Sequence, residues 1–527
     1  MVLGVLANTA RLFESPYVET IRSSNSLMVL TAVGGLVLTA LLWAQIEQRL
    51  LRDPHAPPQV PYILPFFGNM FEFGLGPIKF FQKYRARYGD VYTMLVFGRR
   101  MTVCLGADGN NFFFNAKLAH VSAEEAYKTL TVPVFGKGVV YDVHNSVLME
   151  QKRFMKSALT SDNMRAYVPM IVEETQQFVK RWDQKQGVVE VVQAMAELIT
   201  LTASRTLFGP DVRSQLDETL ADLYHDLDNG FTPLNFLFEN LPLESYRRRD
   251  AAHVALKNIY LQILKKRSIE MDNVKPDMIS HLLNCNYKNG RNLSHEEIAG
   301  IMIALLMAGQ HTSSATSSWT LLHLAENPKL AAKLREEQIE VLGSEDAPLT
   351  FDALKQMPML DNVVSEILRL HPPIIEILRK VVQPVQYPGT NYVIPEGHYL
   401  MASPVVTQMD PKVYRNPLEF RPKRWTEDAK KDYVPSANEK VANDEVDYGF
   451  GVLRTTSARS PYLPFGAGRH RCIGEPFAYL QIKTILATLV REFDFALTDE
   501  GMAKPDFTRM FIMPLSPAKV EYTRRNP

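Results

Sequence analysis

The segment FGAGRHRCIG, from Phe465 to Gly474, decides how this 527-residue chain is interpreted, because it sets one cysteine in a glycine-rich loop. Gly466, Gly468 and Gly474 allow sharp turns and a close backbone approach to a flat ring, which a Cβ atom would obstruct. The residues that follow, EPFAYLQIKTILATLVREF, have helical apolar spacing. Cys472 is therefore expected near a helix N-terminus, where the dipole favours a thiolate. The loop predicts a thiolate ligand to haem iron, an arrangement that favours cleavage of the O–O bond.

The loop has two other interpretations. It could be a glycine-rich turn around a buried structural cysteine, since free cysteine is a common core residue. It could also be part of a zinc site that uses His470 and Cys472. A structural zinc site needs four ligands, however, and Cys104 and Cys285 lie far away without paired spacing.

The loop resembles the haem-binding loop of the cytochrome P-450 superfamily. The matching positions are Phe465, Gly468, Cys472 and Gly474. The resemblance implies haem b, with Cys472 as the axial ligand of the iron and with Phe465 and Gly466 in contact with the ring. Most members carry an arginine where this chain has His470, and that residue holds a haem propionate. Histidine can donate the same hydrogen bond, but its charge depends on pH.

Composition excludes several classes of protein. The chain is 46% hydrophobic and 22% charged, which is ordinary for a globular protein with a large core. Lys and Arg together number 58, as do Asp and Glu, so the bulk charge predicts no nucleic-acid partner. Three irregularly spaced cysteines do not form a disulfide framework and suit a reducing compartment.

The N-terminal region predicts a membrane anchor. Ser23 to Ile46 carries no charge, and its centre, LMVLTAVGGLVLTALLWA, is long enough to span a bilayer as a helix. A cleaved signal peptide is the rival interpretation, although the apolar run is long, starts late and lacks a clear small-residue cleavage site. The flanking charges differ little, and the cysteine usage favours a cytosolic body. The predicted division is a lumenal segment at 1–22, a single-pass anchor at 23–46, a proline-rich linker at 47–69 and a catalytic domain at 70–527.

The body reads as mainly α with a small β region, without internal repeats. Strands are predicted at Val91 to Gly98, Met101 to Gly106 and Asn391 to Ser403. A helix is predicted from His295 to Asn327, because Ser294 and Glu297 have capping-box spacing and Pro328 ends the apolar run. Residues 426–460 are polar and glycine-rich and are expected to form an exposed insertion.

The motif AGQHTS, Ala308 to Ser313, places polar side chains inside this apolar helix. Thr312 can donate a hydrogen bond back to the carbonyl of Ala308 and loosen the helix locally. A packing seam rich in Ser and Thr is the alternative interpretation. Beside the cysteine loop, AGQHT resembles the oxygen-binding helix motif of the superfamily, in which the Thr lies over the iron and helps to deliver protons.

The histidine of this motif narrows the resemblance to one family. Most members carry an acid before the Thr, whereas His311 here resembles the sterol 14α-demethylases, with fungal members closest. In that family the histidine pairs with an aspartate on a preceding helix, which matches Asp228 in LYHDLDNGFTPLNF. The resemblance implies that Thr312, His311 and Asp228 act in catalysis. The alternative is that His311 is a core histidine whose hydrogen bond to Asp228 serves the structure alone.

Glu366 and Arg369 of VVSEILRLHPP lie three residues apart on one face of a predicted helix. A solvated surface pair is one interpretation. The resemblance implies instead a buried structural triad with Arg424 of FRPKRW that supports the cysteine loop from behind.

The stretch YKTLTVPVFGKGVVYD, Tyr127 to Asp142, is expected to be a pocket-lining loop, and it resembles a signature of the sterol demethylases. An ordinary buried loop is the alternative. The resemblance implies that further haem contacts come from Tyr127, Tyr141, Lys152 and Arg379. It also implies that the substrate channel is lined by Tyr127, Leu130, Phe135, Tyr141, Phe236, Ala308, Ile377 and Met510.

The resemblance further implies three successive oxidations of a sterol 14α-methyl group, with release of formate. Because no glycine-rich dinucleotide fingerprint follows a predicted strand, electrons from NADPH are expected to arrive through a separate P-450 reductase, with cytochrome b5 as a further donor. Basic residues expected to dock such a partner are Arg153, Lys156, Arg471 and Lys483. Azoles are the expected inhibitors, and the endoplasmic reticulum membrane is the expected location, with the body in the cytosol.

One position departs from the family. HPPIIEILRK has Ile375 and Glu376 where the family more often shows His and Ser. A charge at Glu376 would be unpaired in apolar surroundings unless it turns to water or meets a cation. A P-450 enzyme that acts on another lipid, and a membrane haem protein without turnover, are therefore the alternative functions.

Overall fold

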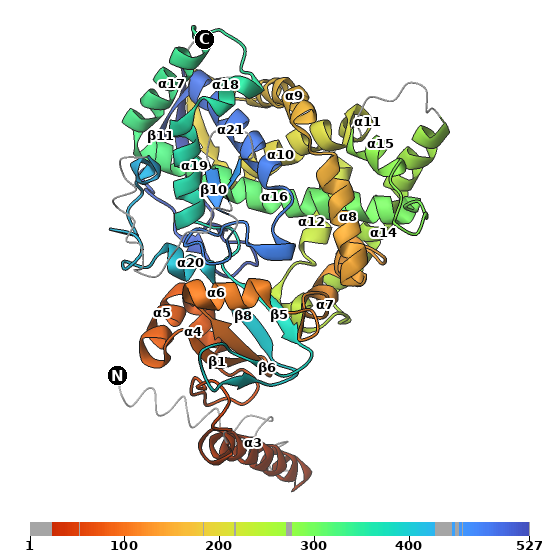
Figure 1. Cartoon of the computed structure of the whole chain (residues 1–527), viewed down its shortest axis with the longest axis vertical. Coiled ribbons are helices and arrows are strands. Elements are labelled where there is room, and N and C mark those ends of the chain that lie inside the picture. The colour runs from red at the N-terminus through yellow and green to blue at the C-terminus, as the bar shows by residue number, and fades with distance from the viewer. Residues whose placement is uncertain are drawn as a thin grey trace.

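The structure is a computed structural model that describes residues 24–51, 53–182, 184–214, 218–269, 277–426, 445–447, 453–455 and 457–525. The predicted lumenal segment at 1–22 and most of the predicted insertion at 426–460 lie outside these residues. The predicted architecture, mainly α with a small β region, is confirmed (Figure 1).

The helices fall along the whole described chain. They are α3 (Ser24–Leu50), α4 (Met70–Leu75), α5 (Pro77–Tyr88), α6 (Gly106–Asn115), α7 (Glu124–Phe135), α8 (Asn145–Ser157), α9 (Ser161–Val179), α10 (Val191–Ala203), α11 (Pro210–Ser214), α12 (Glu218–Asp228), α13 (Pro233–Leu237), α14 (Glu244–Ile269), α15 (Met278–Leu283), α16 (His295–Glu326), α17 (Pro328–Leu342), α18 (Phe351–Lys355), α19 (Pro358–Leu370), α20 (Pro404–Gln408) and α21 (Glu475–Glu492). Short helical turns are η1 (Val140–Asp142), η2 (Ser204–Phe208), η4 (Pro422–Trp425) and η6 (Gly468–His470).

The strands are short and gather into small sheets. They are β1 (Val91–Val96), β2 (Arg99–Cys104), β3 (Val121–Ser122), β4 (Gln186–Glu190), β5 (Ile377–Val381), β6 (Val385–Gln386), β7 (Val393–Ile394), β8 (Tyr399–Ala402), β9 (Glu445–Asp447), β10 (Leu453–Thr455), β11 (Phe493–Leu497), β12 (Pro505–Asp506), β13 (Met513–Pro514) and β14 (Lys519–Arg524).

The largest sheet has the order β1-β2-β8-β5-β3. The first two predicted strands are confirmed as β1 and β2, which pair antiparallel with Val91 opposite Cys104. The third predicted strand is instead divided into β7 and β8, because Gly397 turns the chain with φ +84° between them. β8 runs parallel to β2 and antiparallel to β5. This arrangement places the residues of β5 next to the cysteine loop.

Helix α16 crosses the middle of the body (Figure 1) and confirms the predicted span within one residue. Its capping box is present: the N–H of Glu297 donates to Ser294 Oγ at 3.1 Å, and the N–H of Ser294 donates to the Glu297 carboxylate at 2.8 Å. Most of its residues are buried, but Ala308 is exposed and Gly309 to Thr312 are partly exposed. The middle of a core helix is therefore accessible at this motif.

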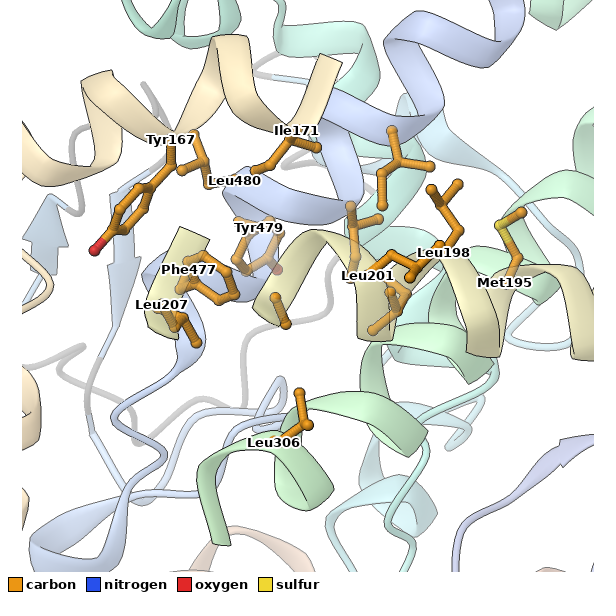
Figure 2. Close-up of a cluster of buried hydrophobic side chains, with 14 of the residues drawn as sticks. Tyr167, Ile171, Met195, Leu198, Leu201, Leu207, Leu306, Phe477, Tyr479 and Leu480 are labelled. Atoms are coloured by element: carbon orange, nitrogen blue, oxygen red, sulfur yellow. The ribbon is translucent and has the colours of Figure 1, made fainter. Parts of the chain in front are cut away.

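The main hydrophobic core lies where α9, α10, α16 and α21 meet. Figure 2 shows Ile171 of α9, Leu198 and Leu201 of α10, Leu306 of α16 and Leu480 of α21 within this cluster. Burial of apolar surface stabilises such a cluster by about 25 cal/mol per Å². This core fixes α21, and with it the loop that immediately precedes α21.

Helix α3 projects from the body (Figure 1), and its span Met28–Leu50 is long and apolar enough to cross a membrane. It continues four residues beyond the predicted boundary at Ile46. α16 also meets the length and composition test, but it is mostly buried and is a core helix.

The segment after α3 is not a free spacer. Gln48 pairs with the backbone of Tyr62, because the N–H of Tyr62 donates to Oε1 and Nε2 donates to the Tyr62 carbonyl, both at 3.0 Å. Val60 is fully buried, whereas Ile63 is 74% exposed. Part of the predicted linker is therefore built into the body, while its other apolar residues remain on the surface.

Candidate active site

The cysteine loop connects η6 to the N-terminus of α21. Gly466 and Gly468 have φ of +70° and +64°, which confirms that the loop needs glycine at these two positions. A Cβ atom on Gly468 would lie 2.8 Å from the carbonyl oxygen of Phe114. Gly474 differs, because its φ is −80°, and its role is proximity to the Cys472 sulfur rather than an unusual backbone conformation.

The Cys472 thiol is accessible but lies within dense surroundings. Burial raises the pKa of the thiol, and the N–H of Gly474 and the charge of Lys152 oppose that effect. The N–H of Gly474 at the helix N-terminus therefore favours the thiolate, while burial favours the thiol. A metal bound at the sulfur would favour the thiolate further.

A buried network of charges lies behind this loop. Arg369 donates to both oxygens of Glu366, at 2.9 and 2.8 Å, and Arg424 Nε donates to the same carboxylate at 3.2 Å. The Glu366 and Arg369 side chains are 0% exposed, so the interpretation as a solvated pair is wrong. Arg369 Nη1 also donates to the carbonyl of Gln408, and Gln408 Oε1 accepts the N–H of Leu463 just before the loop. The triad is thus linked to the loop through Gln408.

Arg379 provides a test of whether a haem fits this site. Its side chain is buried, its Nη1 donates to the Leu378 carbonyl at 2.7 Å, and its guanidinium lies over the Phe113 ring. Within the described ranges Arg379 forms no ion pair with a carboxylate. A buried guanidinium without an anion is unfavourable, so an anionic group such as a propionate fits here.

The other predicted propionate partners behave differently. Lys152 donates to the carbonyls of Arg469 and Arg471, at 3.1 and 2.9 Å, so it holds the cysteine loop directly. Burial, together with the charges of Arg379 and Lys152, lowers the pKa of His470 to about 3. In these surroundings His470 is therefore neutral at physiological pH and can donate a hydrogen bond without carrying a charge.

Tyr127 and Tyr141 form one wall beside Arg379. Their rings stack with centroids 5.1 Å apart. The N–H of Leu378 in β5 donates to the Tyr127 hydroxyl at 2.8 Å, which leaves the phenolic hydrogen free to be donated. The segment that carries Tyr127 was predicted as a loop, but residues 124–135 form α7 and only η1 follows as a short turn.

The middle of α16 carries the polar motif, which contacts α12 and Phe511. The His311 Nε2 atom lies 2.7 Å from Asp228 Oδ1, so the predicted pair is present. Thr312 Oγ1 donates to the carbonyl of Ala308 at 2.8 Å, also as predicted. No atom lies within 4 Å of a Cβ position built on Gly309, which leaves open space next to the helix. Sequence reasoning missed Phe511, whose ring stacks on His311 at 5.0 Å.

An apolar cluster, here called the channel cluster, brings together residues that the sequence assigned to the substrate. Its buried members include Leu130, Phe236, Ile375, Leu378 and Ile512, with Tyr127, Phe231 and Met510 packed against them. Phe135 belongs to the main core but contacts Phe231, with ring centroids 5.4 Å apart. Ile377, in contrast, packs against a separate apolar cluster that contains Phe113 and Phe114, and it lies 4.0 Å from a Cβ position on Gly466.

Sequence reasoning missed one contact that fixes Phe236 within this cluster. Arg99 at the start of β2 donates to the carbonyl of Phe236 at 3.0 Å, and its guanidinium lies 4.5 Å from the centre of the Phe236 ring. The two residues are distant in sequence, so no local pattern could have indicated the contact.

The predicted docking role of Lys483 is wrong. Its side chain is fully buried, 3.0 Å from the Asp361 carboxylate, and it donates to the carbonyl of Leu354. Arg471 forms an ion pair with Glu475 at 2.9 Å and donates to the carbonyl of Gly466, so it stabilises the cysteine loop. Arg153 and Lys156 on α8 remain as candidate docking residues.

Glu376 is the polar exception beside the channel cluster. Its Oε2 atom is buried and has no hydrogen-bond partner among the described residues. Burial raises the pKa of Glu376 to about 7. The sequence-based concern about an unpaired group at this position therefore holds for Oε2, while the residue as a whole is partly exposed.

Replacing Glu376 with glutamine is expected to stabilise the protein at pH 8 but not at pH 5. Because the pKa of Glu376 is raised in the folded state, its contribution to stability is complete below the ordinary value of about 4.3 and is lost as the pH rises through 7. The lost stability at high pH is about 3 kcal/mol. Thermal melts of the haem-loaded protein at both pH values, at one scan rate, measure the difference.

The matched control is Glu396→Gln. Glu396 is an exposed carboxylate that lies three residues before the start of β8. Its melting temperature relative to the native protein is expected to be independent of pH. A pH-independent difference for Glu376→Gln as well would show that the buried carboxyl does not titrate as described.

Comparisons with known proteins agree with this geometry. The family described as Cytochrome P450 matches residues 58–522. A lanosterol 14-alpha demethylase of Cunninghamella elegans is 47% identical, covering 93% of this chain and 95% of that protein. A lanosterol 14-alpha demethylase of Schizosaccharomyces pombe is 45% identical, covering 95% and 100%. An eburicol 14-alpha-demethylase of Uncinula necator is 44% identical, covering 96% and 98%.

A solved structure shows the same fold at lower sequence identity. Retinoic acid bound cyanobacterial CYP120A1 superposes with a TM-score of 0.74 at 22% identity, covering 90% of this chain and 100% of that one. At this identity the likeness concerns the arrangement of helices and sheets alone.

Proposed function

Because this chain belongs to the cytochrome P450 family, we propose that it is a sterol 14α-demethylase that removes the 14α-methyl group of lanosterol or eburicol. The observation that carries the proposal is the joint presence of the Asp228–His311 pair and an accessible Cys472. Identity of 44 to 47% to named demethylases over nearly the whole chain supports the substrate.

The residues present fit a haem. Cys472 would bind the iron, and Arg379, with Tyr127 and Tyr141 beside it, would hold the propionates. Phe465, Gly466 and the neutral His470 would contact the ring on the loop side. When bound, haem activates O2 with two electrons for insertion of oxygen into a C–H bond.

The polar motif of α16 would handle protons. Thr312 is held by its bond to Ala308, with its hydroxyl at the edge of the open space beside Gly309. His311 bonds to Asp228, and both side chains are under one-fifth exposed, so the pair can pass a proton from the surface toward the helix interior. The stacked Phe511 ring fixes the orientation of the imidazole.

The substrate would occupy the channel cluster and be bound mainly by apolar burial, at about 25 cal/mol per Å². The wall would comprise Tyr127, Leu130, Phe135, Tyr141, Phe236, Ala308, Ile377 and Met510. A lipid-soluble substrate suits a body held at a membrane by α3. We therefore retain the division into a lumenal segment 1–22, an anchor, a linker and a catalytic domain, with the anchor helix extended to Leu50.

Electrons would come from NADPH through a P-450 reductase, with cytochrome b5 as a further donor and Arg153 and Lys156 on the docking face. The endoplasmic reticulum membrane, with the body in the cytosol, is the location that suits such partners. Azoles would inhibit by occupying the channel. No nucleic acid is expected as a partner, since basic and acidic residues balance at 58 each.

The function is tested by reconstituting the full chain with a reductase, NADPH and lanosterol or eburicol. Formate and the demethylated sterol are the expected products, and each sterol is expected to shift the iron from low to high spin. A carbon monoxide spectrum typical of thiolate ligation without either sterol shift would favour an enzyme for another lipid. A normal spectrum without turnover on any lipid would favour a non-catalytic haem protein.

Replacing Asp228 with asparagine is expected to lower turnover about 10- to 100-fold while leaving the sterol-induced spin shift intact. The change removes the carboxylate that bonds to His311 and orients it, but it keeps the backbone carbonyl of Asp228 that accepts the N–H of Phe231 in the channel cluster. Single-turnover rates and sterol titrations measure the two effects. Asp226→Asn is the matched control, because Asp226 lies on the same helix and pairs with Arg248 at 2.6 Å. Equal losses in both variants would contradict the proposed role.

A further inference from the structure

The wall of the channel contains a carboxyl group that no protein residue satisfies. Glu376 lies directly before β5, between Ile375, which is buried in the channel cluster, and Ile377, which lies against the cysteine loop. Its Oε2 atom is buried without a partner, and the described part of the chain supplies it with no lysine or arginine ion pair. A buried, unpaired carboxyl is unfavourable, so its surroundings favour any ligand that supplies a donor.

Several observations place this carboxyl at the ligand channel rather than at the outer surface. Burial raises the pKa of Tyr127, and the nearby charge of Glu376 adds to that effect. The Tyr127 hydroxyl accepts the N–H of Leu378, two residues after Glu376. Tyr127, Ile375 and Leu378 meet in the channel cluster. Arg379, the buried cation at the haem side, follows three residues later, which corresponds to about 10 Å of extended chain.

The backbone around Glu376 is fixed. Ser403 Oγ donates to the carbonyl of Ile375 at 2.7 Å, and the N–H of Ile512 donates to the carbonyl of Pro373 at 2.8 Å. Ile377 pairs with Ala402 in the sheet. The Glu376 residue is nevertheless partly exposed, so its buried Oε2 atom borders space that a ligand can enter. Because the segment is held on both sides, the carboxyl is fixed in position for such a ligand.

We propose that Glu376 forms a subsite in the channel wall for a protonated amine carried by a large apolar ligand. The inference rests on the proposed function only in that this channel is the ligand channel of a haem enzyme. An ammonium group supplies both a positive charge and hydrogen-bond donors, and a charge-assisted hydrogen bond is about twice as strong as a neutral one. A neutral ligand of the same shape leaves the carboxyl buried and unpaired, so the neutral ligand is expected to bind with lower affinity.

The subsite is tested with imidazoles that carry apolar tails of several lengths, each tail ending in a primary amine or in a methyl group. The ring nitrogen binds the iron and reports binding through the absorption spectrum, while the tail lies in the channel. At one tail length at least, the amine-ended probe is expected to bind the native protein roughly 10-fold or more tightly than its methyl-ended match.

Glu376→Gln keeps the shape of the side chain and removes its charge, so it is expected to abolish that preference. Glu376→Ile, which matches the neighbouring residues, is expected to favour the methyl-ended probe. Glu396→Gln, an exposed control, is expected to retain the native preference. An unchanged preference in Glu376→Gln, or no preference in the native protein at any tail length, would overturn the proposal.

The same protein samples are titrated with lanosterol, which separates this proposal from the proposed function. A Glu376-dependent preference without a lanosterol shift would support the subsite and contradict the sterol assignment. A lanosterol shift without any Glu376-dependent preference would do the reverse.

Discussion

Replacing Cys472 with serine is expected to abolish turnover and the thiolate-type carbon monoxide spectrum of the reduced protein. A serine hydroxyl is not a thiolate, so it cannot donate electron density to the iron in the way that favours O–O cleavage. Because Cys472 is the accessible cysteine at the loop, no other described sulfur can take its place. The reduced carbon monoxide spectrum and formate release measure the two effects.

Cys285→Ser is the matched control for this experiment. Cys285 is partly buried next to His281, with its sulfur 3.5 Å from Nε2, and it lies in a different part of the chain. Its replacement is expected to leave both the spectrum and the activity close to those of the native protein. An unchanged spectrum in Cys472→Ser would refute the assigned ligand.

Replacing Glu366 with alanine is expected to lose the haem or the fold rather than to lower the rate selectively. The carboxylate accepts bonds from Arg369, Arg424, the indole N–H of Trp425 and the backbone N–H of Arg421. Removing it leaves two buried guanidinium groups without an anion, which costs about 3 to 5 kcal/mol. Haem content after purification and the melting temperature measure the effect.

The chain offers a control with the same helical spacing on the surface. Glu244 and Arg247 also lie three residues apart, 3.5 Å from each other, but both side chains are more than 70% exposed. Glu244→Ala is therefore expected to change neither the haem content nor the melting temperature measurably, because exposed pairs contribute little. Similar losses in the two variants would indicate that burial of the Glu366 network is not the cause.

Local patterns predicted the parts of the fold that depend on neighbouring residues. The capping box at Ser294 and Glu297 and the apolar run after it predicted α16 within one residue, because both signals lie in one short stretch. The glycines of the cysteine loop were equally readable. The pairing of Asp228 with His311 came only from resemblance to a family, since no spacing rule relates residues on two different helices.

Other features depend on contacts that a sequence does not display. A lysine such as Lys483 is usually exposed. Here its side chain is buried, and its charge is balanced by Asp361 of another helix. The segment that begins at Tyr127 contains Pro133, which predicted a loop. Pro133 removes one backbone hydrogen bond of α7, and the helix ends two residues later. The packing of α7 against other elements, which a local pattern does not display, keeps the preceding turns helical.

The joint between α3 and the body has a consequence for access from the lipid. Gln45 and Gln48 both donate to the carbonyl of Tyr62, and Glu47 forms an ion pair with Arg100 on β2. A swivel of the body about this joint would have to break all of these bonds together. With α3 in a bilayer, the tilt of the body would therefore follow the tilt of this helix, and replacing Glu47 and Gln48 with alanine would uncouple the two.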